Sequence, residues 1–407
     1  MSMANKFRFL CGLLLCASSI FAEDKGGWLD WQFPKDSPVL MRDHKGLTNV
    51  TMRGPYMIVE LHETLILINV GKKPICGLSL RVEAQDITPW GKGSVIKPSL
   101  FVLPGEEFPV KVDMQLMRPI TAAKSESAMV QVSLDCALFS DLKAYGPDKL
   151  NSRRTLMVYE MEARRDRQFL NRLLDSGKLP ELRAELNFGM QDPIQGQLGL
   201  ELLRGPRVAS SREQSLAVNP VNFPKAPVQP LSGAAQVAGN EVRAPRVDVR
   251  NVSKLHVMSV AMGWIVRDDH GTDFVAGALT SRSPIGPVQT SSISEPGTLR
   301  FSLPTGQPMI IDRLMTFVND VEFADGSLWI PSRDDIDAAT QDVTLRRELA
   351  TSPEEQRLAS IYRRDGIAVI PNYGLGWIRN AQSFRFAVFS TPSSGFLLRL
   401  LAKARDA

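Results

Sequence analysis

The sequence predicts a mainly β protein built from two antiparallel β-sandwich units, each followed by an α-helix. The main observation is an internal repeat, because residues 69–86 (NVGKKPICGLSLRVEAQD) and 251–268 (NVSKLHVMSVAMGWIVRD) align without a gap. Both copies then reach a Pro-Gly step and the pattern F-x-D, which is followed by an aromatic residue and a proline. A repeated unit of roughly 90 residues has the size of one small β-sandwich domain.

Strand and helix patterns follow each other in the same order in both copies. Residues 38–146 alternate between apolar and polar residues in short runs, broken by turn signals such as Pro104-Gly105. After Pro147 the composition changes to Glu, Arg, Leu and Met, which predicts a helix over about 153–174. The second copy repeats this change after Pro331, where Ser332 and Asp335 have the spacing of a helix capping box.

These patterns divide the chain into seven segments. We expect a signal peptide at 1–22, a first β-sandwich repeat at 23–148, a first helical segment at 149–190, a flexible linker rich in Pro, Ala and Gln at 191–243, a second β-sandwich repeat at 244–332, a second helical segment at 333–366, and a tail at 367–407 with a strand-like run and an amphipathic end.

The first 22 residues have the parts of an export signal. Lys6 and Arg8 precede the apolar stretch Leu10–Ile20, and Ala22 supplies a small residue for cleavage. No later stretch is apolar enough to span a bilayer. We therefore expect an exported protein, periplasmic or secreted, whose tail is the one part suited to peripheral membrane contact.

The charge of the chain favours no particular partner. The 48 basic and 44 acidic residues are spread along the sequence, and the formal net charge is +4. Nucleic-acid-binding proteins usually concentrate basic residues on one face, so we expect no nucleic-acid partner.

Two cysteines, Cys76 and Cys136, remain after the leader is removed. Strand alternation predicts that both point into the sandwich core. An inter-sheet disulfide and two free buried thiols both fit this pattern. With Trp90 between them, the cysteines resemble the Cys, Trp, Cys framework of immunoglobulin domains, but the second repeat departs from it because Met258 stands in place of Cys76.

No motif in the chain supports catalysis, so we expect a non-enzymatic protein without cofactor or metal. His62-Glu63 begins like a zinc-protease motif but lacks its second histidine, and Asp268–His270 has the composition of a hairpin turn. Ser94 and Lys97 have S-x-x-K spacing without the further motifs of that enzyme class. The arginines 164, 165 and 167 alternate with acidic residues, which predicts a solvated helix face.

The aromatic residues after F-x-D, Tyr145 and Trp329, are the candidate binding anchors, because they recur at one spacing in both copies. The alternative is that each ring covers the open end of its sandwich beneath the following helix. We favour this packing role, since a residue kept in both halves is what packing of a helix on a sheet requires.

The leader, strand pattern and repeat together resemble the broad group of bacterial exported proteins built from immunoglobulin-like β-sandwich repeats. The resemblance implies a non-catalytic extracytoplasmic binding or scaffold protein whose ligand is unknown. Two alternatives stay open. One is a component of an envelope or surface assembly that holds a protein partner through sheet edges or the tail. The other is a hydrolase or metal-dependent enzyme.

Overall fold

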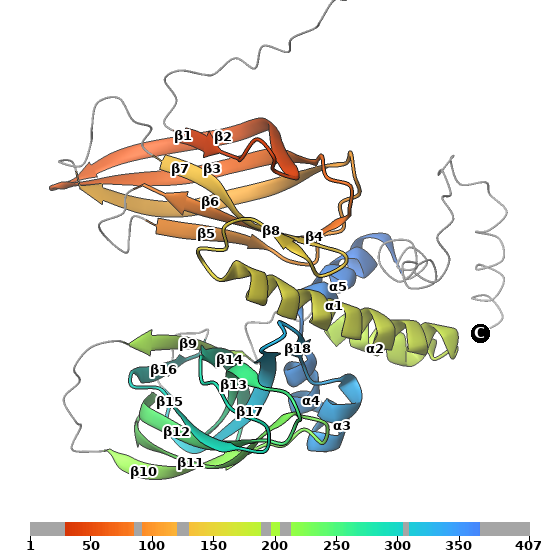
Figure 1. Cartoon of the computed structure of the whole chain (residues 1–407). Coiled ribbons are helices and arrows are strands. Elements are labelled where there is room, and N and C mark those ends of the chain that lie inside the picture. Colours follow the sequence, from red (N-terminus) through yellow and green to blue (C-terminus); the bar gives the residue numbers. More distant parts are fainter. Residues whose placement is uncertain are drawn as a thin grey trace, which may run out of the picture.

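The computed structural model describes residues 29–84, 92–119, 130–188, 197–203, 213–303 and 309–366. The expected signal peptide and the C-terminal tail lie outside these residues, as does Trp90. Two β-rich parts lie one above the other, with helix α1 between them (Figure 1). We call residues 29–188 unit 1 and residues 197–366 unit 2. The predicted mainly β class is confirmed.

Unit 1 consists of two sheets that face each other. Its elements are β1 (Leu29–Gln32), β2 (Val39–Arg53), β3 (Tyr56–Asn69), β4 (Ile75–Glu83), β5 (Lys92–Lys97), β6 (Glu107–Pro119), β7 (Val130–Phe139), β8 (Ala144–Tyr145), α1 (Ser152–Asp175) and α2 (Leu179–Phe188). One sheet has the order β1-β7-β4-β5, with β8 paired to β7, and the other has the order β2-β3-β6. Alternating apolar residues of both sheets, such as Leu65 of β3 and Leu80 of β4, share one core.

Unit 2 is a closed barrel rather than the predicted second sandwich. Its elements are β9 (Gln197–Leu203), β10 (Gln214–Pro220), β11 (Val228–Ala238), β12 (Glu241–Asn251), β13 (Val257–Asp268), β14 (Asp273–Ser281), β15 (Thr290–Ser294), β16 (Thr298–Ser302), β17 (Ile311–Phe323), β18 (Leu328–Trp329), α3 (Arg333–Ala339), α4 (Val343–Ala350) and α5 (Pro353–Asp365). The eight strands β10-β11-β12-β16-β9-β14-β13-β17 form a ring, because β10 pairs with both β11 and β17.

The segment 191–243 is not the flexible linker that its composition predicts. It contains β9, β10, β11 and the start of β12. β9 pairs antiparallel with β16 over five residue pairs and parallel with β14 over two, so it completes the barrel wall. Its leucines 198, 200 and 202 face the barrel core, which explains why a short strand with few aromatics is stable there.

The repeated segments fold in the same way in both units. β4 pairs antiparallel with β7, and β13 pairs antiparallel with β17. Arg81 lies opposite Ser133 in the first pair, and the equivalent Gly263 lies opposite Phe317 in the second. Register shifts also occur at equivalent places, between Ser79 and Leu80 and between residues 261 and 262. The two units are therefore variants of one strand arrangement.

Asn69 and Asn251, which open the two repeats, make the same buried contacts. The Asn69 Nδ2 donates to the carbonyls of Lys73 and Val102, both at 2.9 Å. The Asn251 Nδ2 donates to the carbonyls of Leu255 at 2.8 Å and Ile285 at 3.2 Å. A buried amide that satisfies carbonyls of two different segments fixes the turn between two strands.

Helix α1 lies on the outer face of β4 and β7. Leu156 packs so closely on Gly77 that a Cβ atom at position 77 would lie 2.8 Å from the Leu156 Cδ2. Ser152 and Ser79 share a hydrogen bond of 2.8 Å beside this contact.

In unit 2, α3 begins with the predicted capping box of Ser332 and Asp335. Among the described residues, no helix is both long and apolar enough to cross a bilayer.

Candidate functional site

Tyr145 and Trp329, the candidate anchors, occupy equivalent places and are half-buried. Tyr145 lies opposite Ala137 of β7, and Trp329 lies opposite Val321 of β17. The Tyr145 ring packs on the unit 1 core and its hydroxyl donates to the Asp36 Oδ1 at 2.9 Å. Trp329 packs between the barrel core and the apolar cluster beneath α3 and α4. Both rings therefore contact core side chains.

Cys76 and Cys136 are free, buried thiols. The prediction that they point into the sandwich core is wrong for Cys136, which packs with Leu156 and Met157 of α1. It is wrong for Cys76 too, because Cys76 is the extra residue of a register shift between Ile75 and Gly77 and is buried outside that core. The register shift between Ser79 and Leu80 places Cys136 on the outer face of the sheet, because an extra residue reverses side-chain alternation. Burial raises the pKa of both thiols to about 12, so they are protonated and unreactive near neutral pH.

The remaining sequence motifs lie apart from one another. The Asp268 Oδ1 accepts hydrogen bonds from the backbone N–H groups of His270 and Thr272, which makes this motif a hairpin turn. Ser94 and Lys97 lie on strand β5, where residues three apart point to opposite faces. Within the described ranges, no group of three or more His, Cys, Asp or Glu side chains has the arrangement of a metal site.

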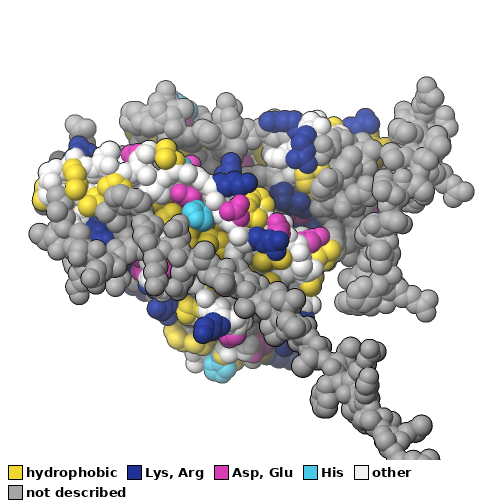
Figure 2. All heavy atoms as spheres, turned by 90° about the horizontal axis from the view of Figure 1, so that it is seen from above, with side chains coloured by type: hydrophobic (Ala, Val, Ile, Leu, Met, Phe, Trp, Pro, Cys, Tyr) yellow, Lys and Arg dark blue, Asp and Glu magenta, His cyan; other side chains and the backbone are white. Residues whose placement is uncertain are grey.

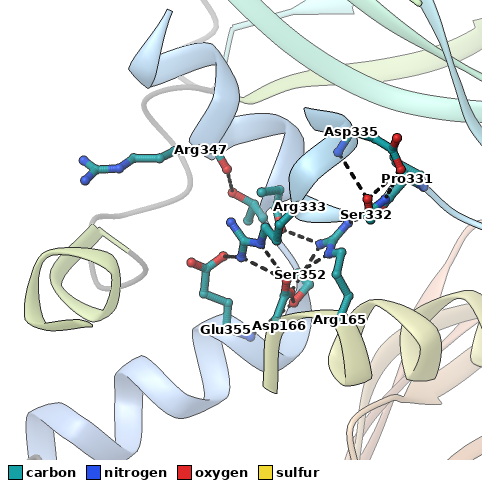
Figure 3. Close-up of polar contacts among 11 residues, drawn as sticks. Arg165, Asp166, Pro331, Ser332, Arg333, Asp335, Arg347, Ser352 and Glu355 are labelled. Atoms are coloured by element: carbon teal, nitrogen blue, oxygen red, sulfur yellow. Dashed lines mark hydrogen bonds and ion pairs between the residues drawn. The ribbon is translucent and has the colours of Figure 1, made fainter. Parts of the chain in front are cut away.

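The most developed polar site is a buried ionic cluster between the units, which we call the junction (Figure 3). Its centre is Asp166 of α1, whose exposed fraction is 0%. The Asp166 carboxylate accepts hydrogen bonds from the Nε of Arg165 at 2.9 Å and from the Nε of Arg333 at 3.0 Å. It also accepts one from the Ser352 hydroxyl, which precedes α5. Three elements of the two units thus meet at one carboxylate.

A second set of ion pairs continues the junction along α1. Arg167 of α1 bridges two buried carboxylates, with distances of 3.1 Å to Glu160 and 3.0 Å to Glu354 of α5. The Arg165 Nη2 also donates to the Ala350 carbonyl at the end of α4, at 2.7 Å. Because backbone and side-chain acceptors both take part, α1 is fixed to the helices of unit 2 in position and in rotation.

The first turn of α1 contacts the barrel wall directly. Arg154 pairs with Asp320 of β17, and its Nη1 donates to the Thr280 hydroxyl at 2.5 Å. Arg282, which follows β14, donates to the Asn151 Oδ1 at 2.7 Å. The contacts between the units therefore run from the start of α1 to Arg172, which pairs with Asp334, and continue on α2, where Glu185 pairs with Arg347.

The charges of the junction shift the acids in opposite directions. Burial alone would raise the pKa of Asp166, but Arg165 and Arg333 outweigh it and hold this pKa below its ordinary value. Burial raises the pKa of Glu355 to about 7, although Arg333 lies 3.5 Å away and acts in the opposite sense. Asp166 is thus the permanent counter-charge, whereas Glu355 changes protonation near neutral pH.

The arrangement couples the helices of the two units to each other. Arginines and a serine of the same chain pair with the junction carboxylates, which are buried in the helix contacts. A buried ion pair that loses one partner costs about 3–5 kcal/mol, so such a cluster strongly specifies one arrangement. The prediction of a solvated helix face for the arginines of α1 is wrong, because Arg165 is buried against unit 2. The alternation of charges along α1 does not predict this burial, because the side chains of unit 2 that pair with α1 lie more than 160 residues away in the sequence.

The barrel interior is filled by side chains. The cavity against Trp264 and Met262 measures about 30 Å³, which is room for one or two waters. The Trp264 Nε1 has no hydrogen-bond partner within the described part of the chain, and a water in this space would supply one.

The surface shows no segregation of charge on the face seen from above. Basic and acidic side chains are interspersed there among apolar ones (Figure 2). This pattern matches the even distribution of charge along the sequence.

Comparisons with known proteins add little. No family model matches the chain, and no curated protein sequence is similar to it. Among solved structures, a β-glucosidase from Kluyveromyces marxianus aligns at 10% identity with a TM-score of 0.15, over 70% of this chain and 46% of that protein. The chain thus spans less than half of that protein, and a similarity this low carries no argument about fold or function.

Proposed function

We propose that this protein is a non-catalytic, exported scaffold that holds two β units in one fixed arrangement and binds a partner through them. The observation that carries the proposal is the Asp166 carboxylate, which is buried between two arginines of different units. A protein whose units bound independently would need no such junction. The expected signal peptide supports a site of action outside the cytoplasm.

The decisive experiment separates the units without touching either β core. Asp166→Ala leaves Arg165 and Arg333 buried without their counter-charge, and we expect a loss of about 3–5 kcal/mol in the free energy of unfolding. Small-angle scattering should show a larger radius of gyration, and cross-linking in the native envelope should lose the partner that wild-type protein captures. Asp248→Ala is the control, because Asp248 belongs to an exposed ion pair with Arg246. Unchanged scattering and partner capture in Asp166→Ala would refute the scaffold.

A component of an envelope assembly is the second candidate, and apolar side chains at one end of the barrel favour it. Val252, Leu255, Met258 and Val288 are each more than two-fifths exposed. They surround the turn that Asn251 fixes, where the Asn251 N–H donates to the Gln289 carbonyl at 2.9 Å. Replacing Leu255 and Val288 by serine should abolish incorporation into such an assembly while the purified protein keeps its melting temperature.

A further inference from the structure

Unit 1 contains a hollow of about 480 Å³ on the outer face of its β1-β7-β4-β5 sheet. This volume lies within the range of about 300–1,000 Å³ that is typical of small-molecule sites. The wall comes from three places: Phe33 after β1, Arg81 and Ser133 on the paired strands β4 and β7, and Lys149 before α1. Helix α1 begins at Ser152 and covers the other end of this face, which leaves the hollow open.

The same place in unit 2 is filled. Phe317 stands where unit 1 has Ser133, and Gly263 stands where unit 1 has Arg81. The Phe317 ring lies so close to Gly263 that a Cβ atom there would be 2.3 Å from the ring. Phe223 packs on Phe317 edge to face at 5.9 Å, and Ile336 of α3 completes a buried apolar cluster. One strand arrangement thus carries an apolar core in unit 2 and a polar hollow in unit 1.

The wall of the hollow contains a buried acid with free hydrogen-bonding capacity. Asp135 is 1% exposed, and its Oδ1 accepts from the backbone N–H of Lys149 at 2.8 Å. Its Oδ2 has no hydrogen-bond partner in the part of the chain that the structure describes. A buried carboxylate oxygen without a donor is costly, and such a group at a cavity wall points to a ligand or water that supplies the donor.

The neighbouring strand β4 carries a hydrogen-bond donor that lacks an acceptor. The Arg81 guanidinium pairs with Glu83 through Nη2, but its Nε–H has no acceptor among the described residues. Lys149, an exposed residue, also lines the hollow. The wall therefore holds a carboxylate that lacks a donor and a guanidinium that lacks an acceptor, both on covered atoms, while Phe33 offers apolar contact.

We propose that this hollow binds a small zwitterion, with the ligand ammonium directed to Asp135 and the ligand carboxylate to Arg81 and Lys149. Free amino acids and short peptides both have this chemistry. The site lies apart from the junction, so binding does not depend on the scaffold role proposed above.

The test is ligand-induced stabilisation of the full chain, followed by calorimetry. The probes are a pool of free L-amino acids, a pool of dipeptides that includes Ala-Ala, and two single-charge compounds, ethylamine and acetate. We expect at least one zwitterionic pool to raise the melting temperature, and ethylamine and acetate to leave it unchanged at the same concentration. The amino-acid and dipeptide arms distinguish the two sources of the zwitterion.

Two variants assign the binding to the hollow. Asp135→Asn keeps the oxygen that accepts from Lys149 but removes the charge, and it should weaken binding roughly ten- to hundredfold. The double variant R81G/S133F installs the residues of unit 2 and should abolish binding by filling the space, so it tests the site even where Asp135→Asn folds poorly. Asp113→Asn on the exposed face of β6 is the control and should bind as wild type does. No stabilisation by either pool, or equal affinity in the double variant, would mean that water alone occupies the hollow.

Discussion

Unit 1 and unit 2 share one strand arrangement, yet one is an open pair of sheets and the other a closed barrel. The difference comes from how the strands at the edges of the sheets pair. In unit 2, β9 bridges β16 and β14, and β10 pairs with both β11 and β17. In unit 1, the described strands contain no counterpart of β9, and β1 pairs only with β7. Closure therefore depends on one added strand and one additional pairing, not on a different core.

The outer faces differ as much as the edges do. Unit 2 covers the face of β13 and β17 with α3, α4 and a pair of phenylalanines. Unit 1 leaves the corresponding face polar and hollow beside α1. The inner side of the repeat is packed in both units, while the outer side is covered in unit 2 and hollow in unit 1.

The largest effect should come from the paired positions Phe317 and Ser133. Phe317→Ala removes a buried ring that packs on Gly263, so we expect a loss of about 3–5 kcal/mol in the free energy of unfolding. Ser133→Ala, at the equivalent place, should change this free energy by no more than about 0.5 kcal/mol. Urea denaturation measures both. Equal losses would mean that the two outer faces are packed alike.

Breaking β9 should convert the barrel into an open structure like unit 1. Leu200→Pro removes a backbone N–H from the strand opposite Phe301 of β16, and we expect a loss of about 2 kcal/mol. Hydrogen exchange should then accelerate in β14 and β16. Leu200→Ala keeps the N–H and is the control, with lower stability but protected amides. Protection of both strands in the proline variant would contradict closure by β9.

The two asparagines test how alike the repeats are. Asn69→Ala and Asn251→Ala each leave buried carbonyls without their donor, so each should cost about 1–3 kcal/mol. Thermal unfolding of both variants gives the comparison directly. A large loss in one variant and none in the other would show that only one copy still depends on this amide.

The smallest change, counted per pH unit, should come from a pH dependence of the junction. Burial raises the pKa of Glu355 from 4.5 to about 7, so between these values the folded protein holds a proton that the unfolded chain has released. The stabilisation is complete below pH 4.5 and is lost as the pH rises to 7, with a slope of at most about 1.4 kcal/mol per pH unit. Burial shifts Glu348 in the same direction.

Denaturation of wild type and Glu355→Gln at pH 5, 6, 7 and 8 checks this expectation. The variant should show a flatter profile below pH 7 and the same profile above it. An identical slope in both proteins would exclude Glu355 as a source of the pH dependence.

Much of the fold was accessible from the sequence, but the candidate site was not. The strand alternation around Asn69 and Asn251, and the capping box at Ser332, predicted local structure because they depend on neighbours in the chain. A second signal is present: Phe33-Pro34-Lys35 and Phe223-Pro224-Lys225 follow the equivalent strands β1 and β10, which places part of the second unit inside the expected linker. The Asp166 junction left no such signal, since its partners come from α3 and α5.

Local sequence patterns are enough to predict that the protein is mainly β, that one strand pattern occurs twice, and that a helical segment follows each copy. These features arise from alternation, turns and caps, which act over a few residues. Contacts between distant segments are what close unit 2, place Cys136 beneath α1 and bury the charges of α1. Each of these depends on a strand edge, a register shift or an ion pair between distant segments, and side-chain periodicity carries no information about such partners.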